Sequence, residues 1–201
     1  MTESKVYIVD DDDAMRDSLK WLLESRGLKV ELYPSGEAFL GAFSGDLRGC
    51  LVLDVRMPGM SGMDLYARLK ARASNLPVIF ITGHGDVPMA VSALKKGAAD
   101  FIEKPFSDQD MVRLIESCLK QDRAAAAKRA EKASLARNME SLTQREREVL
   151  GLIVDGKLNK QIADDLGISI KTVEVHRSRV MEKMGADSVA ELVQLVLKLR
   201  T

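Results

Sequence analysis

Short apolar runs alternate with amphipathic stretches along the first 121 residues. The runs are bounded by turn residues and are almost continuously hydrophobic, which is typical of strands buried in a parallel sheet. Between them, apolar residues recur at helical spacing, as in Leu19, Leu22 and Leu23. The alternation predicts an α/β fold, a five-stranded doubly wound parallel sheet with five helices. The predicted strands are Lys5–Val9, Lys29–Tyr33, Cys50–Leu53, Val78–Ile81 and Asp100–Glu103.

The remainder of the chain predicts helices only, because it holds no proline or aromatic residue after Phe106. Residues 122–140 are rich in Ala and charge, which favours a helical linker, either separate or continuous with a helix from Asp108. The apolar side chains of this segment are too small to predict a core. A dimeric coiled coil is the alternative interpretation of the segment.

Four short helices are predicted over residues 141–201. Thr143 and Glu146 form a capping-box pattern that opens the first helix. Asn159 and Ser169 are predicted caps of the second and third helices, the third being about Ile170–Met184. The fourth spans about Ser188–Leu199. Such spacing fits a helix-turn-helix domain or a generic four-helix bundle.

Charge differs between these segments. The 201 residues carry 30 basic and 30 acidic side chains. A net charge of zero by itself argues against nucleic-acid binding, because nucleic-acid-binding proteins usually carry an excess of basic residues. However, it is the sum of −3 over residues 1–121, +2 over 122–140 and +1 over 141–201. Neutrality therefore does not exclude DNA, and it predicts weak binding by a single C-terminal domain.

The two cysteines, Cys50 and Cys118, lie in apolar stretches far apart in the sequence. They predict buried free thiols rather than a disulfide. The sequence has neither a secretory signal nor an apolar run of the roughly 18 residues that a membrane span needs. We therefore expect a cytoplasmic protein without a membrane partner.

Polar side chains follow four of the predicted strands. Asp10 and Asp11 follow the first, Asp54 the third, Thr82 the fourth and Lys104 the fifth. Carboxyl ends of parallel strands meet at one edge of the sheet, so these groups should lie together. Crowded carboxylates repel one another unless a cation lies among them, and Mg²⁺ prefers oxygen ligands. A lysine and a hydroxyl suit a phosphoryl group.

These residues give the sequence its resemblance to a known family. Val9-Asp10-Asp11, Asp54 to Gly62, Ile81-Thr82-Gly83 and Lys104-Pro105-Phe106 resemble the motifs of two-component receiver domains. The resemblance covers residues 5–120 and implies a flavodoxin-like receiver domain over 1–121. The whole chain resembles the NarL/FixJ branch of response regulators, and most closely FixJ-like regulators.

The resemblance also implies roles for single residues. Asp54 accepts a phosphoryl group from a sensor histidine kinase. Lys104 and the Thr82 hydroxyl contact the phosphoryl oxygens, and Phe101 is the aromatic switch residue that reorients with Thr82. The Lys104–Pro105 bond is expected to be cis. The implied ligands of Mg²⁺ (or Mn²⁺) are Asp10, Asp11, Asp54 and the backbone carbonyl of Arg56.

The alternative reading of the acidic cluster is an enzyme. Haloacid-dehalogenase phosphatases use an Asp nucleophile with a second Asp two residues later, but that position after Asp54 is Arg56. His84 could be a catalytic base, although a loop residue near the site fits equally well. We expect no enzyme beyond Mg²⁺-dependent self-phosphorylation and dephosphorylation of Asp54.

A second resemblance lies in the C-terminal domain. Asn159 to Ala163, Leu166 to Ser169 and Lys171 to Arg177 resemble the LuxR/NarL-type helix-turn-helix domain, here residues 141–201. This makes Ile170–Met184 the recognition helix, with Val173, His176, Val180 and Met184 facing the core. The predicted DNA contacts are Lys160, Lys171, Thr172, Arg177 and Arg179 to phosphates and Glu174, Val175 and Ser178 to base edges.

The last helix has more apolar surface than one face needs. By the same resemblance it pairs two such domains on DNA, and Val189 and Val193 are the candidate dimer residues. The sequence thus predicts a transcription regulator whose phosphorylation promotes dimeric binding to double-stranded DNA. A phosphorylation-controlled interaction or RNA-binding module is the alternative.

Overall fold

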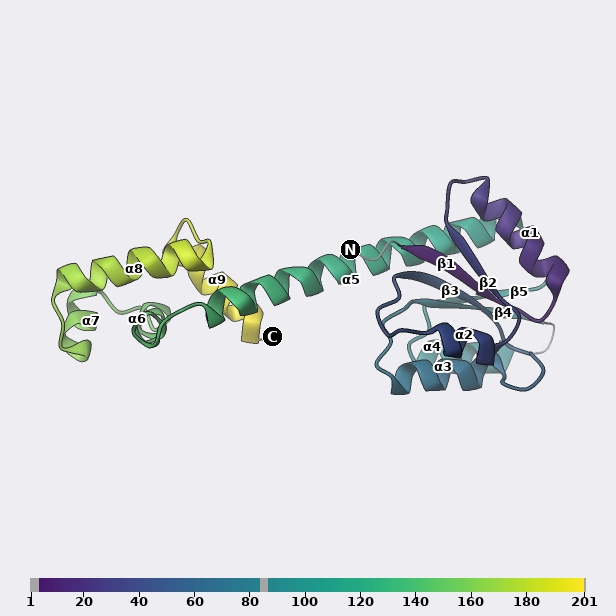
Figure 1. The fold of residues 1–201 in the computed structure, drawn as a ribbon, viewed down its shortest axis with the longest axis horizontal. Helices are drawn as coiled ribbons and strands as arrows, with labels where there is room; N and C mark the ends of the chain where they lie inside the picture. The colour runs from purple at the N-terminus through teal and green to yellow at the C-terminus, as the bar shows by residue number, and fades with distance from the viewer. Residues whose placement is uncertain (1–3, 84–86, 201) are drawn as a thin grey trace. The chain divides into compact units, whose positions relative to one another are not determined.

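The structure is a computed structural model that describes residues 4–83 and 87–200 (Figure 1). The chain divides into two compact units, residues 1–125 and 126–201. Within the described residues, no helix is long and apolar enough to cross a membrane.

The first unit contains the predicted parallel sheet. Its strands lie in the order β2-β1-β3-β4-β5, with every neighbouring pair parallel. The order turns at β1 and β3, so the carboxyl ends of these two strands meet at the topological switch point. The five-stranded doubly wound fold is therefore confirmed. The strands are β1 (Lys5–Val9), β2 (Val30–Tyr33), β3 (Gly49–Asp54), β4 (Val78–Thr82) and β5 (Asp100–Glu103).

Helices cover both faces of this sheet, because its strands are apolar on both sides. One buried cluster joins one face to α1 and α5, through residues such as Leu23 and Ile115. A second joins the other face to α2, α3 and α4, through residues such as Phe39 and Leu65. The helices are α1 (Asp13–Glu24), α2 (Gly36–Ala42), α3 (Gly62–Ala71), α4 (Val87–Lys95) and α5 (Asp108–Glu140).

Both cysteines belong to the first of these clusters. Cys50 on β3 and Cys118 on α5 are free and buried, as predicted. Burial raises the pKa of the Cys50 thiol well above its usual range. The neutral thiol of Cys50 therefore behaves as a small apolar core residue.

Helix α5 is continuous over 33 residues and passes through the whole 122–140 segment. Asp122 on this helix is only 3% exposed. Arg48 Nε donates to both Asp122 carboxylate oxygens at 3.0 Å and Arg48 Nη2 donates to Oδ2 at 2.9 Å. The Ser4 hydroxyl adds a third donor at 3.3 Å. This cluster fixes the middle of α5 to the segments that precede β1 and β3.

The second unit packs four further helices around its own core. The prediction that the 122–140 segment contributes nothing to a core is wrong for two residues of this unit: Leu135 is buried and Met139 packs against the core. Both residues lie near the end of the segment, where Met139 meets the following helices. The helices are α6 (Gln144–Val154), α7 (Asn159–Leu166), α8 (Ile170–Met184) and α9 (Val189–Arg200).

Two of the three predicted helix caps are confirmed. Thr143 and Glu146 form the complete capping box of α6, and Ser169 caps α8. Asn159 does not cap α7, because it is already the first helical residue. The preceding Leu158 occupies the cap position, and its N–H donates to Gln161 Oε1 at 2.9 Å. The Gln161 side chain thus supplies the reciprocal half of a capping box, and Leu158 offers no side-chain oxygen to the first turn.

Candidate functional site

The polar residues predicted at the strand ends meet at one edge of the sheet. Lys104 follows β5, and its Nζ donates to Asp54 Oδ1 at 2.9 Å and to Asp10 Oδ2 at 3.1 Å. Asp10 and Asp54 are 1% and 6% exposed. One ammonium therefore joins two buried carboxylates from neighbouring strands, and the three side chains keep a net charge of −1.

Burial and charge act in opposite directions on these groups. Burial and the charge of Asp10 raise the pKa of Asp54, and Lys104 lowers it by less, so the net shift is upward. Burial lowers the pKa of Lys104, but the hydrogen bonds and charges of Asp54 and Asp10 outweigh it. The net pKa of Lys104 is raised, so its ammonium keeps its charge at neutral pH.

Thr82 lies at the end of β4, beside β3 and β5 in the sheet. Its side chain is 0% exposed, and its Oγ1 has no hydrogen-bond partner among residues 4–83 and 87–200. A buried hydroxyl without a partner costs free energy, and such a group in a polar site calls for a functional explanation. The hydroxyl of Thr82 is therefore a hydrogen-bond donor that is available to a ligand of this site.

The remaining predicted residues of this site surround the carboxylates. Asp11 is exposed next to buried Asp10, and Asp12 caps α1. The N–H of exposed Arg56 donates to Asp54 Oδ2 at 2.8 Å. Phe101 is half-buried on β5 and packs against the second cluster. His84 lies outside the described residues.

Two local features hold the site in shape. The Lys104–Pro105 bond is cis, as expected. Gly62 opens α3 where the loop after β3 folds back, and a Cβ there would lie 2.1 Å from the Asp54 carbonyl oxygen. Only glycine permits this close approach. The backbone therefore requires the glycine at the end of the Met-Pro-Gly-Met-Ser-Gly run after Asp54.

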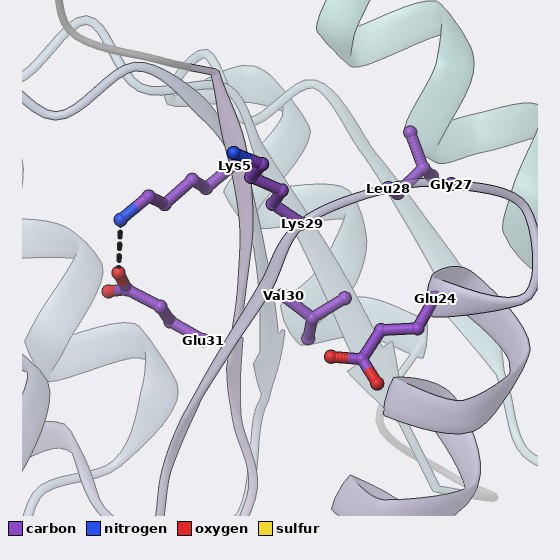
Figure 2. Close-up of a pocket in the computed structure, with 7 residues that line it drawn as sticks. All are labelled: Lys5, Glu24, Gly27, Leu28, Lys29, Val30 and Glu31. Carbon is purple, nitrogen blue, oxygen red and sulfur yellow. Dashed lines mark hydrogen bonds and ion pairs between the residues drawn. The ribbon is translucent and has the colours of Figure 1, made fainter.

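A separate hollow lies at the opposite, amino-terminal end of β1 and β2 (Figure 2). Lys5 Nζ forms an ion pair with Glu31 Oε1 at 2.5 Å beside it, and Lys29 and Glu24 also line it. Charges of both signs surround the hollow, so it favours neither an anion nor a cation. It also lies away from Asp54, which ends β3.

The outward face of α8 carries the predicted DNA residues. Lys171, Thr172, Glu174, Val175, Ser178 and Arg179 are exposed on it, and Lys160 is exposed on α7, whereas Arg177 is half-buried. Val173, Val180 and Met184 are buried, as predicted for the inner face. His176 is half-buried, and none of the described residues forms a hydrogen bond with its Nδ1. Thr172 Oγ1 is 2.8 Å from the cap hydroxyl of Ser169.

The candidate dimer residues differ in exposure. Val189 is 41% exposed, at the start of α9, and Val193 is half-buried. Leu197, one further turn along, is 51% exposed. Leu197 is not among the predicted dimer residues, although it lies four residues after Val193 and therefore on the same stripe of the helix.

Sequence reasoning missed one charged pair in the second unit. Lys183, near the end of α8, donates to Glu146 Oε2 of α6 at 2.6 Å. The pattern Thr143-Gln-Arg-Glu146 predicted only the cap of α6. No local signal relates residue 146 to residue 183, because their contact depends on how α6 and α8 pack.

Comparisons with known proteins agree with the predicted receiver and helix-turn-helix folds. Residues 6–116 match the response regulator receiver domain, and residues 140–196 match the luxR family of bacterial regulatory proteins. The transcriptional regulatory protein FixJ of Bradyrhizobium diazoefficiens is 47% identical over 98% of this chain and 96% of its own. The response regulator protein TodT of Pseudomonas putida is 45% identical over 98% and 87%. The structure of the response regulator StyR has a TM-score of 0.90 at 44% identity, covering 98% of this chain and all of its own.

The fold and the site together define a regulator built from a phosphoacceptor domain and a helix-turn-helix domain. The chain belongs to the two-component response regulators with a luxR-type output domain. This pair of domains indicates phosphorylation-dependent regulation of transcription, with a sensor kinase and DNA as partners. The relatives are named as regulators, which agrees with the expectation that the chain is not an enzyme.

Proposed function

We propose that Asp54 is the phosphoacceptor and that its phosphorylation promotes dimeric binding of residues 141–201 to double-stranded DNA. The observation that carries the proposal is the bridge from Lys104 to Asp54 and Asp10, beside the unpartnered hydroxyl of Thr82. A hydroxyl and an ammonium next to an acceptor carboxylate are the donors that phosphoryl oxygens require.

The transfer itself needs mainly position and charge. An Asp54 carboxylate oxygen attacks phosphorus, the bond from phosphorus to the phosphohistidine nitrogen breaks, and that nitrogen leaves with the electron pair. Lys104 stabilises the negative charge of the transferred group on one side. Asp54 then holds a dianionic acyl phosphate in place of a carboxylate.

The donor set fits Mg²⁺ or Mn²⁺. Mg²⁺ is usually bound through one or two carboxylates and several waters. Asp10 and Asp54 are buried and close enough to share the Lys104 ammonium, although no group of three acidic, His or Cys side chains gathers within residues 4–83 and 87–200. Asp10, Asp11, Asp54 and the Arg56 carbonyl would hold the ion, which supplies positive charge beside the attacking carboxylate.

The acyl phosphate gives Thr82 the partner that its hydroxyl lacks. Thr82 then donates to a phosphoryl oxygen, and half-buried Phe101 on the neighbouring strand reorients with it. The added charge at Asp54 thus shifts the equilibrium between two conformations of the face formed by α4, β5 and α5. The phosphorylated state associates through this face and brings two α8 helices to half-sites about one DNA turn apart.

In the DNA complex, Lys160, Lys171, Thr172, Arg177 and Arg179 contact phosphates. Glu174, Val175 and Ser178 meet base edges in the major groove. Val189 and Val193 pair the two output domains. The exposed face of α8 supports these assignments, because its inner face is occupied by the core.

Asp54→Asn provides the direct test. We expect it to abolish labelling from acetyl phosphate or from the sensor kinase and to leave the fold unchanged, as seen by circular dichroism. Asp64→Asn, an exposed carboxylate at the start of α3, is the matched control and should label normally. Labelling of Asp54→Asn at wild-type stoichiometry would refute the proposal. Mobility shifts on duplex DNA and on single-stranded RNA then separate the two possible targets of α8.

A further inference from the structure

The position of α8 in the second unit is set by two kinds of contact. Val173, Val180 and Met184 bury its inner face in the core. Apolar burial is non-directional, so it determines which face points inward better than it determines the position of the helix along its axis. A hydrogen-bonded contact at one end of the helix supplies that missing constraint.

Lys183 makes this contact near the carboxyl end of α8. Its Nζ donates to Glu146 Oε2 at 2.6 Å and to the Ser141 carbonyl at 3.1 Å. The same Glu146 oxygen accepts the Thr143 N–H at 2.8 Å. Within residues 4–83 and 87–200, Lys183 is the only α8 side chain with a hydrogen bond or ion pair to another helix or to the turn before α6.

Three features of its location strengthen the ion pair between Glu146 and Lys183. Glu146 is 2% exposed, so its carboxylate depends on these donors. Lys183 and the Thr143 N–H lower the pKa of Glu146 to about 2, so the carboxylate is charged at every physiological pH. Glu146 lies in the first turn of α6 and Lys183 in the last turn of α8, where each charge complements its own helix dipole.

Arg145, the residue before Glu146 on α6, fixes the end of α7. Arg145 Nη2 donates to the Leu166 carbonyl, the last residue of α7, at 3.0 Å. Consecutive residues of α6 thus hold the two helices of the helix-turn-helix, one at the end of α7 and one at the end of α8.

We infer that Glu146 and Lys183 are positioning residues for DNA recognition. Their ion pair sets the axial position of α8, and therefore the height at which Glu174, Val175 and Ser178 meet the base edges. Lys183 acts through Glu146 rather than through a phosphate. The inference rests on the proposed function of α8 and deepens it, because it separates a lysine that orients the recognition helix from those that touch DNA.

The test uses the full chain activated with beryllofluoride and Mg²⁺. The probe is a duplex that the wild-type protein enriches from a random-sequence pool, compared with an unrelated duplex of equal length. Glu146→Gln keeps an oxygen for the Thr143 N–H but removes the charge. Lys183→Met removes the ammonium, and Lys183→Arg replaces it with a guanidinium that keeps the positive charge. Glu148→Gln, which breaks an α6 pair whose side chains are 34–41% exposed, is the matched control.

We expect Glu146→Gln and Lys183→Met to weaken binding of the selected duplex about tenfold, comparable to one mismatched base pair. Binding of the unrelated duplex should stay unchanged, whereas a general folding defect would weaken both. Lys183→Arg should restore most of the specific affinity, and Glu148→Gln should bind as the wild type does.

The salt dependence separates positioning from direct contact. Loss of one phosphate contact lowers the slope of log K against log salt by about 0.9. We expect no change of slope for Lys183→Met. A slope lowered by that amount, with normal binding by Glu146→Gln, would overturn the inference, as would wild-type specificity in both variants. Failure of the wild type to enrich any duplex would instead overturn the proposed function of α8, and this inference with it.

Discussion

The Thr82 hydroxyl is buried, and within the described part of the chain it has no hydrogen-bond partner. In a resting protein this is a cost, because a buried donor without a partner loses about 1–3 kcal/mol relative to its hydrated state. The cost is removed when a phosphoryl oxygen arrives beside it. The Thr82 hydroxyl thus raises the free energy of the unphosphorylated state relative to that of the phosphorylated state.

Replacing Thr82 tests this idea. Thr82→Val keeps the shape of the side chain and removes the hydroxyl, so it should stabilise the unphosphorylated first unit by about 1 kcal/mol. The same variant should still be labelled at Asp54, but this phosphorylation should promote dimerisation and DNA binding only weakly. Urea unfolding of the full chain measures the stability, with Thr82→Ser as the control that keeps the hydroxyl. A less stable Thr82→Val would show that the hydroxyl has a partner in solution.

Glu146 makes the acid stability of the second unit predictable. Its folded-state pKa of about 2 is below the ordinary value of 4.5. A lowered carboxylate pKa contributes stability that is complete above the unfolded value and is lost as pH falls through the folded value. The Tm of the second unit should therefore drop between about pH 4.5 and pH 2. Glu146→Gln should lower the Tm at pH 7 and flatten this part of the curve; parallel curves for the two proteins would contradict the assignment.

At the scale of elements, α5 is held by residues that lie far from it in sequence. Asp122 accepts from Arg48 and Ser4, and its carboxylate is almost fully buried. Breaking a buried ion pair from one side leaves the other charge unpaired. The turn of α5 around Asp122 therefore depends on the segment that leads into β3.

Asp122→Ala should destabilise the first unit by about 3 kcal/mol, since Arg48 loses its buried partner. Hydrogen exchange should speed up in α5 around residues 119–125 before it does so in the sheet. Asp110→Ala removes an exposed i,i+3 pair with Arg113 at the start of the same helix and should cost less than about 1 kcal/mol. Equal losses for the two variants would contradict the argument from burial.

Elements with a strong local pattern were predictable and contacts between distant residues were not. The five strands and the recognition helix follow from apolar periodicity, and the strand ends predicted the meeting of Asp10, Asp54 and Lys104. Asn159 is not a cap because α7 begins one residue earlier than its pattern predicts, with Leu158 at the cap position. The burial of Leu135 has no local signal in the Ala-rich segment around it. Glu146 with Lys183 and Arg48 with Asp122 are separated by 37 and 74 residues, so no local pattern relates them.

For the molecule as a whole, the charge balance makes association important. The exposed part of α8 is less basic than its sequence indicates, because Lys183 is engaged with Glu146. One output domain therefore offers few phosphate contacts, and two together double their number. Phosphorylation that brings two domains together would raise affinity without any change in α8 itself.

Sedimentation with and without beryllofluoride measures this association. We expect the mass of the wild type to double on activation, because the acyl phosphate analogue favours the associating face. Asp54→Asn should stay a monomer under both conditions. DNA affinity should rise in step with the dimer fraction, and an activated protein that binds DNA tightly as a monomer would contradict dimerisation as the switch.

The burial of Asp122 also determines where this protein can be cut. A fragment that ends at residue 121 contains every side chain of the phosphorylation site but leaves Arg48 without its carboxylate, and Ser4 without its acceptor. A fragment that ends at Ala125 keeps both and coincides with the first compact unit. Residues 122–125 take no part in phosphoryl chemistry. They nevertheless decide whether the isolated receiver behaves as it does in the intact chain.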